Sequence, residues 1–145
     1  MLYVLYDSQC ELCIRCRDWL MKQAAFVCLV FIPLQSEEVH RRFPGIDMLK
    51  PDEQLLVISD DGCVYRGECA WIMCLWALQK YREHAQRLAS PVLLPFAKIV
   101  CELLSRNRFF LSDALFRQDP ESAARKLTAH YALHKAGWQS THCSR

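Results

Sequence analysis

The chain has 145 residues, a length that fits one domain with room for a small additional element. Hydrophobic residues make up 52% and charged residues 23%, with only 4 glycines and 6 prolines, which argues against collagen-like repeats, long flexible linkers and low-complexity disorder. The formal net charge of +2 is too balanced for a protein that grips nucleic acid through its phosphates, so we expect no nucleic-acid partner.

The apolar segments of the sequence indicate in which cellular compartment the protein is expected. No run of about 20 mostly apolar residues is present, so no membrane span is expected. The first residues lack the basic start and apolar run of a signal peptide, which predicts a cytoplasmic location. In a reducing cytoplasm the nine cysteines should be free thiols, metal ligands or a catalytic pair rather than structural disulfides.

The first third of the chain predicts a strand–helix–strand unit. Residues 2–6 are apolar, aromatic and β-branched, which is typical of a short buried strand. Residues 10–25 contain no glycine or proline and repeat apolar side chains at three- and four-residue spacing, which predicts an amphipathic helix. Residues 26–32 are seven apolar residues in a row, which predicts a fully buried strand parallel to the first.

A hairpin and further helices follow. Ser36 is expected to cap a short helix over 36–42, and residues 43–54 should form a loop. The turn Asp60-Asp61-Gly62 between two apolar runs predicts an antiparallel hairpin of strands 55–59 and 63–66. The remaining helices are expected over 68–83, 95–106 and 120–136, the last with Asp119 as its cap.

The element order is therefore a βαβ unit followed by a ββα unit. On one four-stranded mixed sheet this is the thioredoxin-like arrangement, so the expected fold class is α/β, thioredoxin-like, with added C-terminal helices. We expect the domain over residues 1–112 and a helical extension over 113–145, packed on the domain or partly mobile.

The pair Cys10-Glu-Leu-Cys13 follows the first strand and opens the first helix. A helix N-terminus offers unpaired N–H groups and partial positive charge, which stabilise a thiolate, the nucleophilic form of cysteine. We expect Cys10 to be the exposed nucleophile. Cys13, one turn further inside, would resolve the mixed disulfide formed on Cys10. The expected activity is thiol–disulfide exchange without a bound cofactor.

Cys16 leaves an alternative open. Cys10, Cys13 and Cys16 form Cys-x-x-Cys-x-x-Cys, which also suits a non-enzymatic zinc or iron–sulfur module. Against this, no fourth cysteine follows within a few residues, and three ligands on one continuous helix point progressively apart. A further alternative is a binding domain in which the pair is vestigial.

The segment Tyr6-Asp7-Ser8-Gln9-Cys10-Glu11-Leu12-Cys13 resembles the Asp-x-x-Cys-x-x-Cys signature of the DCC family of thiol–disulfide oxidoreductases. Looser similarities lie in 31–35, which includes Pro-Leu-Gln, in 64–67 and in Arg106-Asn107-Arg108-Phe109. The resemblance covers roughly residues 1–112. It implies a thioredoxin-like fold and a dithiol activity, on substrates that the family leaves poorly defined.

Asp7 belongs to this signature, and two roles are open for it. It could accept the proton of Cys13 when that thiol attacks, or cap the helix through backbone N–H groups. With Glu11, it places two negative charges beside the pair, which should disfavour the thiolate and give a reductant-like potential. We expect Arg106 and Arg108 to neutralise the C-terminus of a helix.

Three residues are expected to contact the substrate beside the cysteine pair. The hairpin returns the chain toward Cys10, so Glu68 and Cys69 at the next helix start would line a substrate groove; the segment resembles the Glu-Ser helix start of glutathione transferases. The alternative is an ordinary helix cap with a buried cysteine. Thioredoxins place a cis proline immediately before the third strand, where this chain has Gln54, with Pro51 three residues early. Expected partners are a disulfide-containing protein or small thiol, and a thioredoxin- or glutathione-type electron donor.

Overall fold

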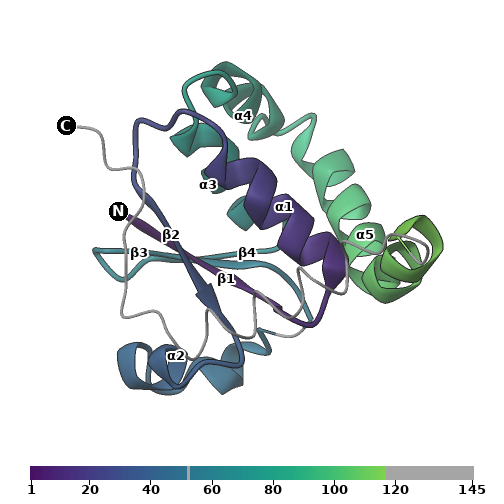
Figure 1. The fold of residues 1–145 in the computed structure, drawn as a ribbon. Helices are drawn as coiled ribbons and strands as arrows, with labels where there is room; N and C mark the ends of the chain where they lie inside the picture. The colour runs from purple at the N-terminus through teal and green to yellow at the C-terminus, as the bar shows by residue number, and fades with distance from the viewer. Residues whose placement is uncertain (52, 117–145) are drawn as a thin grey trace.

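In the computed structural model, which describes residues 1–51 and 53–116, a four-stranded sheet carries helices on both faces (Figure 1). The strands are β1 (Leu2–Tyr6), β2 (Leu29–Pro33), β3 (Leu56–Ser59) and β4 (Val64–Arg66). The helices are α1 (Glu11–Met21), α2 (Glu37–Arg42), α3 (Glu68–Ala77), α4 (Arg82–Leu88) and α5 (Leu94–Phe116), with a 3-10 turn η1 (Ile46–Leu49) inside the segment expected to be a loop.

The sheet has the order β2-β1-β3-β4. β1 pairs with β2 in parallel, and β3 runs antiparallel to both β1 and β4. A parallel pair needs a crossover, which α1 supplies, whereas the antiparallel pair needs only the tight turn, where Gly62 has a φ of +86°. This topology confirms the βαβ and ββα units and the thioredoxin-like fold class.

Alternation along β1 sends side chains into two cores. Leu2 and Val4 pack with buried residues of α1 and α3, whereas Leu5 packs with Val39 of α2 on the opposite face. Figure 1 shows α1 and α3 on one face of the sheet and α2 on the other. The sheet is therefore covered on both faces, and β1 contributes side chains to the core on each face.

The second predicted strand and the third predicted helix are both shorter than expected. β2 begins only at Leu29, and Phe26 is 61% exposed, so the prediction of a fully buried strand over 26–32 is wrong. The reason is a tertiary contact: the N–H of Phe26 donates to the carbonyl of Ala77 at 2.8 Å, and Ala25 bridges Leu78. The same pairing holds Leu78 extended and ends α3, so the expected helix over 68–83 is interrupted.

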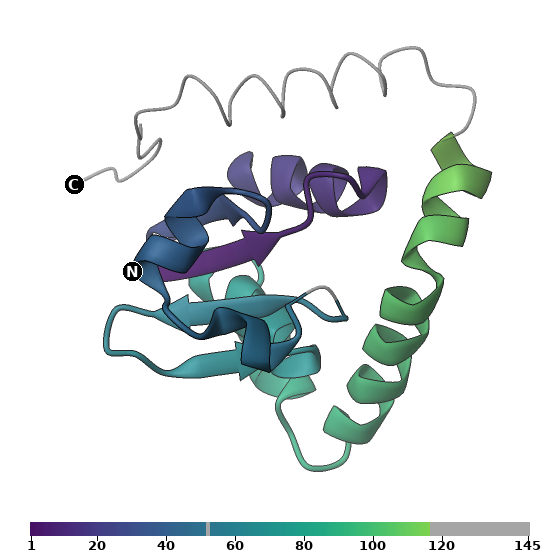
Figure 2. The same cartoon turned by 90° about the horizontal axis from the view of Figure 1, so that it is seen from below.

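Helix α5 is longer than the predicted helix over 95–106. It continues through the expected domain boundary at 112/113, so most of the expected extension, including the helix over 120–136, lies outside the described residues. Figures 1 and 2 show the N-terminal end of α1 facing α5. None of the described helices combines the length and the apolar character needed to cross a membrane.

Candidate active site: a dithiol at the start of helix α1

Cys10 is the N-cap of α1. Its backbone is extended (φ −96°, ψ 112°), and its Sγ accepts the N–H of Cys13 at 3.4 Å. An N-cap side chain normally satisfies an otherwise unpaired N–H of the first turn with oxygen; here sulfur does so. The cap position thus directs a backbone dipole at the Cys10 sulfur and brings the two cysteine side chains together.

The two thiols differ in acidity. The hydrogen bond from the Cys13 thiol, which outweighs the opposing effect of burial, lowers the pKa of Cys10 to about 7 from an ordinary 9.0. The Cys13 N–H and the Arg108 guanidinium act in the same direction, and Asp7 opposes them. The same hydrogen bond to Cys10, followed by burial, raises the pKa of Cys13. One sulfur therefore favours the thiolate and the other keeps its proton.

Asp7 is held by the loop between β1 and α1. Its Oδ1 accepts the N–H of Gln9 at 2.9 Å and the side-chain amide of Gln35 at 2.8 Å. The Gln35 Oε1 in turn accepts from the N–H and the hydroxyl of Ser8. Asp7 therefore orders the loop before the helix, while the cap itself is Cys10, so the capping role considered for Asp7 is wrong.

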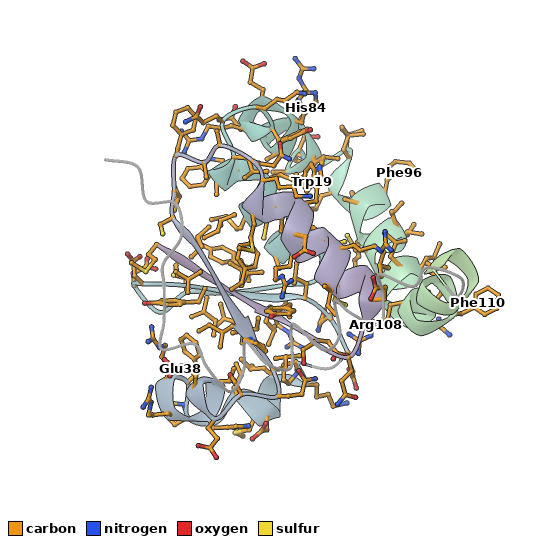
Figure 3. The ribbon with its side chains drawn as sticks, viewed as in Figure 1. Trp19, Glu38, His84, Phe96, Arg108 and Phe110 are labelled. Carbon is orange, nitrogen blue, oxygen red and sulfur yellow. The ribbon has the colours of Figure 1, made fainter. Side chains whose placement is uncertain are left out.

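Arg108 reaches this site from α5 (Figure 3). Its Nη2 lies 3.6 Å from the Asp7 Oδ2, and both side chains are largely buried. The expectation that Arg106 and Arg108 neutralise a helix C-terminus is wrong, because α5 continues to Phe116. Gln35 and Arg108 lie in two segments that resemble the DCC family, but nothing in their spacing indicated that both would contact Asp7.

Of the two cysteines, the one expected to be exposed is the more buried. Cys10 has no exposed surface, whereas Cys13 is half-buried. The prediction that Cys10 is the exposed thiol is therefore wrong. A residue at a helix start is normally open to solvent, but here the start of α1 faces α5, and the two helices are in contact (Figure 2).

Glu11 does not act on the pair as expected. It is 2% exposed, and its Oε1 accepts from Arg15 Nε at 3.0 Å, while Oε2 has no hydrogen-bond partner. Both carboxylates near the dithiol thus face arginines, and the pKa of Cys10 is lowered. Asp7 does disfavour the Cys10 thiolate, as expected, but the hydrogen bonds from Cys13 outweigh its effect, so the expected net result is wrong.

Cys16 lies one turn beyond Cys13 on α1. Burial, followed by the nearby Cys10, raises its pKa to about 11, so it favours the neutral thiol. Across residues 1–51 and 53–116 no three histidine, cysteine, aspartate or glutamate side chains are grouped so that they could hold a metal ion. This geometry lends no support to the zinc or iron–sulfur alternative.

The three residues expected on the substrate side lie around the start of α3. Glu68 is half-buried and contributes, after burial, to raising the pKa of Cys101 on α5, while Cys69 is exposed. Gln54 packs against Gly67, whose φ is +54°. No cis peptide bond occurs in the described part of the chain. The substrate-binding roles of Glu68, Cys69 and Gln54 stay predictions.

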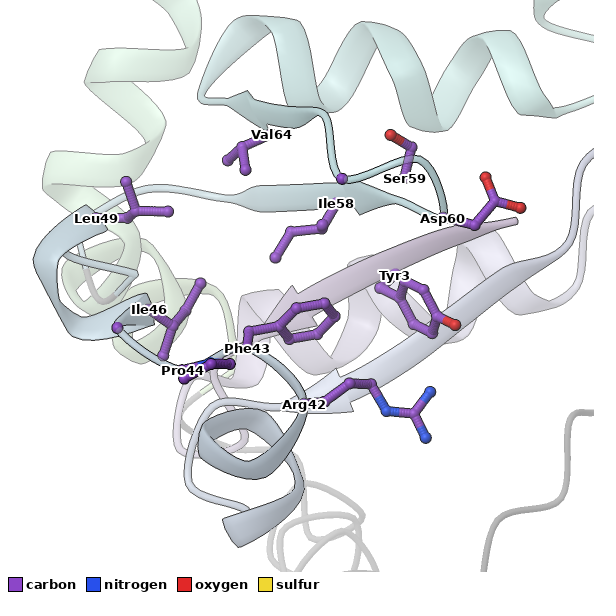
Figure 4. A pocket seen from close by; sticks show the side chains of 12 residues that line it. Tyr3, Arg42, Phe43, Pro44, Ile46, Leu49, Ile58, Ser59, Asp60 and Val64 are labelled. Atoms are coloured by element: carbon purple, nitrogen blue, oxygen red, sulfur yellow. The ribbon is translucent and has the colours of Figure 1, made fainter.

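A surface pocket of about 530 Å³ lies elsewhere (Figure 4). Its aromatic wall is formed by Tyr3 and Phe43, whose rings meet edge to face at 5.5 Å, with Arg42 above Tyr3. The full lining is Tyr3, Arg42, Phe43, Pro44, Gly45, Ile46, Leu49, Ile58, Ser59, Asp60, Gly62 and Val64. None of these residues belongs to the dithiol site.

Comparison with known proteins gives one match. A search of curated proteins finds no match, nor does a search of solved structures. Residues 4–114 match the family model described as DCC1-like thiol-disulfide oxidoreductase, and this range includes the dithiol, Asp7, Gln35 and Arg108. Since the match spans well over half of the 145 residues, the chain belongs to the DCC1-like thiol-disulfide oxidoreductase family.

Proposed function

We propose that this protein exchanges thiols and disulfides with Cys10 as nucleophile and Cys13 as resolving thiol. Family membership supports redox chemistry. The observation that carries the individual roles is the unequal acidity of two adjacent sulfurs, with the pKa of Cys10 lowered to about 7 and that of Cys13 raised. A pair whose environments separate its two pKa values is suited to two successive roles.

The reaction runs in two displacements. The Cys10 thiolate attacks one sulfur of a substrate disulfide, which breaks the substrate S–S bond and releases one substrate thiolate. Cys13 then loses its proton, and its thiolate attacks the Cys10 sulfur, which breaks the bond between Cys10 and the substrate, releases the second substrate thiolate and leaves a Cys10–Cys13 disulfide. The dithiol has lost two electrons and the substrate has gained them. A thioredoxin- or glutathione-type donor, which a cytoplasmic location would supply, then reduces the Cys10–Cys13 disulfide back to the dithiol.

Asp7 assists the second displacement in this proposal. Cys13 must lose a proton that its surroundings hold tightly, because both the hydrogen bond to Cys10 and burial raise its pKa. Once Cys10 is bonded to substrate, its sulfur no longer carries the charge that opposes this ionisation. Asp7 is buried, lies near enough to affect both thiols, and is the acceptor for the proton.

The substrate is a disulfide-containing protein or a small disulfide of a cellular thiol. Glu68, Cys69 and Gln54 remain the proposed substrate-side residues. Because Cys10 has no exposed surface, the first displacement requires the site to open. A small disulfide needs a smaller opening than a folded protein does.

A mixed-disulfide trap tests the proposal. The Cys13→Ser variant cannot resolve an intermediate on Cys10, so disulfide-linked species should accumulate in cells and disappear on reduction. The matched control is Cys10→Ser/Cys13→Ser, which keeps every other cysteine and should trap nothing through this site. Equal trapping by both variants would reject Cys10 as the nucleophile. Stoichiometric zinc or iron in untagged protein would favour the metal-binding alternative.

A further inference from the structure

Helix α5 buries a cation beside the dithiol. The Arg108 side chain is 13% exposed, although arginine is seldom buried without a partner because removing its charge from water is costly. Arg106, two residues earlier on the same helix, is exposed to solvent. Figure 3 shows Arg108 near the start of α1.

The Asp7 carboxylate divides its two oxygens between different partners. Oδ1 is occupied by the Gln9 N–H and the Gln35 amide, so this oxygen is held by neutral donors. Oδ2 faces the Arg108 guanidinium at 3.6 Å, an ionic contact rather than a short hydrogen bond. The loop thus fixes the carboxylate, and the helix brings the opposite charge to it.

An unpaired carboxylate at this place would oppose the chemistry, since a negative charge near a thiol disfavours the thiolate. The groups that act on Cys10 come from three elements: Asp7 in the β1–α1 loop, Cys13 on α1, and Arg108 on α5. Cys16, also on α1, is itself affected by Cys10. Glu11, also on α1, is paired with Arg15.

We propose that Arg108 is a positioning residue of the dithiol site, which pairs with the fixed Asp7 carboxylate so that the Cys10 thiolate forms beside a neutralised charge. This inference rests on the proposed role of Cys10 as nucleophile. In support of it, Arg108 favours the ionised form of both Cys10 and Cys13, and Asp7 disfavours it for both.

The test measures the pH dependence of Cys10 alkylation in a Cys13→Ser background. Trypsin cuts first after Arg15, so peptide 1–15 then contains Cys10 as its single cysteine and can be followed by mass spectrometry. Arg108→Met should raise the alkylation midpoint by about one pH unit, which slows alkylation at pH 7 about fivefold. Arg108→Lys should keep most of the reactivity, and Arg106→Met should change nothing.

A double variant separates charge pairing from a structural effect. Asp7→Asn alone should lower the midpoint, and Asp7→Asn/Arg108→Met should return it toward the starting value, because both charges are gone. An unchanged alkylation midpoint in Arg108→Met overturns the inference. So does a midpoint in Asp7→Asn/Arg108→Met that rises as far as it does in Arg108→Met alone. Failure of the proposed function looks different: the alkylation midpoint of Cys10 would then lie near the ordinary 9.0 before any change at Arg108.

Discussion

Replacing Cys13 by alanine or by serine separates its role as resolving thiol from its role as hydrogen-bond donor to Cys10. Both variants lose the resolving sulfur, but serine keeps a side-chain donor in hydrogen-bonding reach of the Cys10 sulfur and alanine does not. The Cys13 thiol is the largest contribution to the lowered pKa of Cys10, so alanine should raise that pKa and serine should largely preserve it.

The expected loss of alkylation rate follows from the thiolate fraction of Cys10 at its lowered and at its ordinary pKa. With a pKa of about 7, half of Cys10 is thiolate at pH 7; with the ordinary 9.0, about 1% is. Complete loss of the shift would slow alkylation at pH 7 about fiftyfold. The Cys13 N–H and Arg108 still favour the thiolate in the alanine variant, so we expect a loss between about fivefold and fiftyfold.

The assay is iodoacetamide labelling between pH 5 and pH 10, with the rate for peptide 1–15 plotted against pH. Because the thiolate is the reactive form, the rate rises with pH through the pKa of Cys10. The expected midpoint lies near 7 for Cys13→Ser and distinctly higher for Cys13→Ala. Identical midpoints in the two variants would refute the assignment of the lowered pKa to the side-chain hydrogen bond.

Three further outcomes are expected. The ratio of the labelling rate by small iodoacetamide to that by a bulky maleimide should be much higher at Cys10 than at exposed Cys63, because Cys10 has no exposed surface; equal ratios at both sites would contradict this burial. Leu56→Ala should lower the free energy of unfolding in urea by about 2–5 kcal/mol, since Leu56 is fully buried in the sheet, and a loss below about 1 kcal/mol would contradict its core position. Gly67→Ala should destabilise more than Gly45→Ala in the same assay, because Gly45 lies in the left-handed region (φ 84°, ψ 10°), whereas Gly67 has φ 54° and ψ −120°, a combination that residues with a Cβ seldom adopt.

Local sequence signals were enough for the sheet and the position of the dithiol. The strand at 2–6, the Asp-Gly turn and the glycine-free amphipathic segment after Cys10 each follow from short-range physics, and together they predict the observed βαβ and ββα order. The start of α1 is likewise local, because the cap is formed by residues three apart. Where prediction failed within this part, as at Phe26, a contact with the end of α3 overrode an apolar run.

The chemistry of the site depends on contacts that no local pattern contains. Asp7 and Arg108 are about one hundred residues apart in the chain, yet their side chains face each other at 3.6 Å beside the dithiol, and they act on the Cys10 thiolate in opposite directions. Cys10 likewise has no exposed surface, although a residue at a helix start is normally open to solvent. Sequence determined that the cysteine pair opens the first helix, because the signals that end the strand and start the helix are local. Only the tertiary structure decided the charge and the solvent around the Cys10 sulfur, because both depend on which distant surfaces pack together.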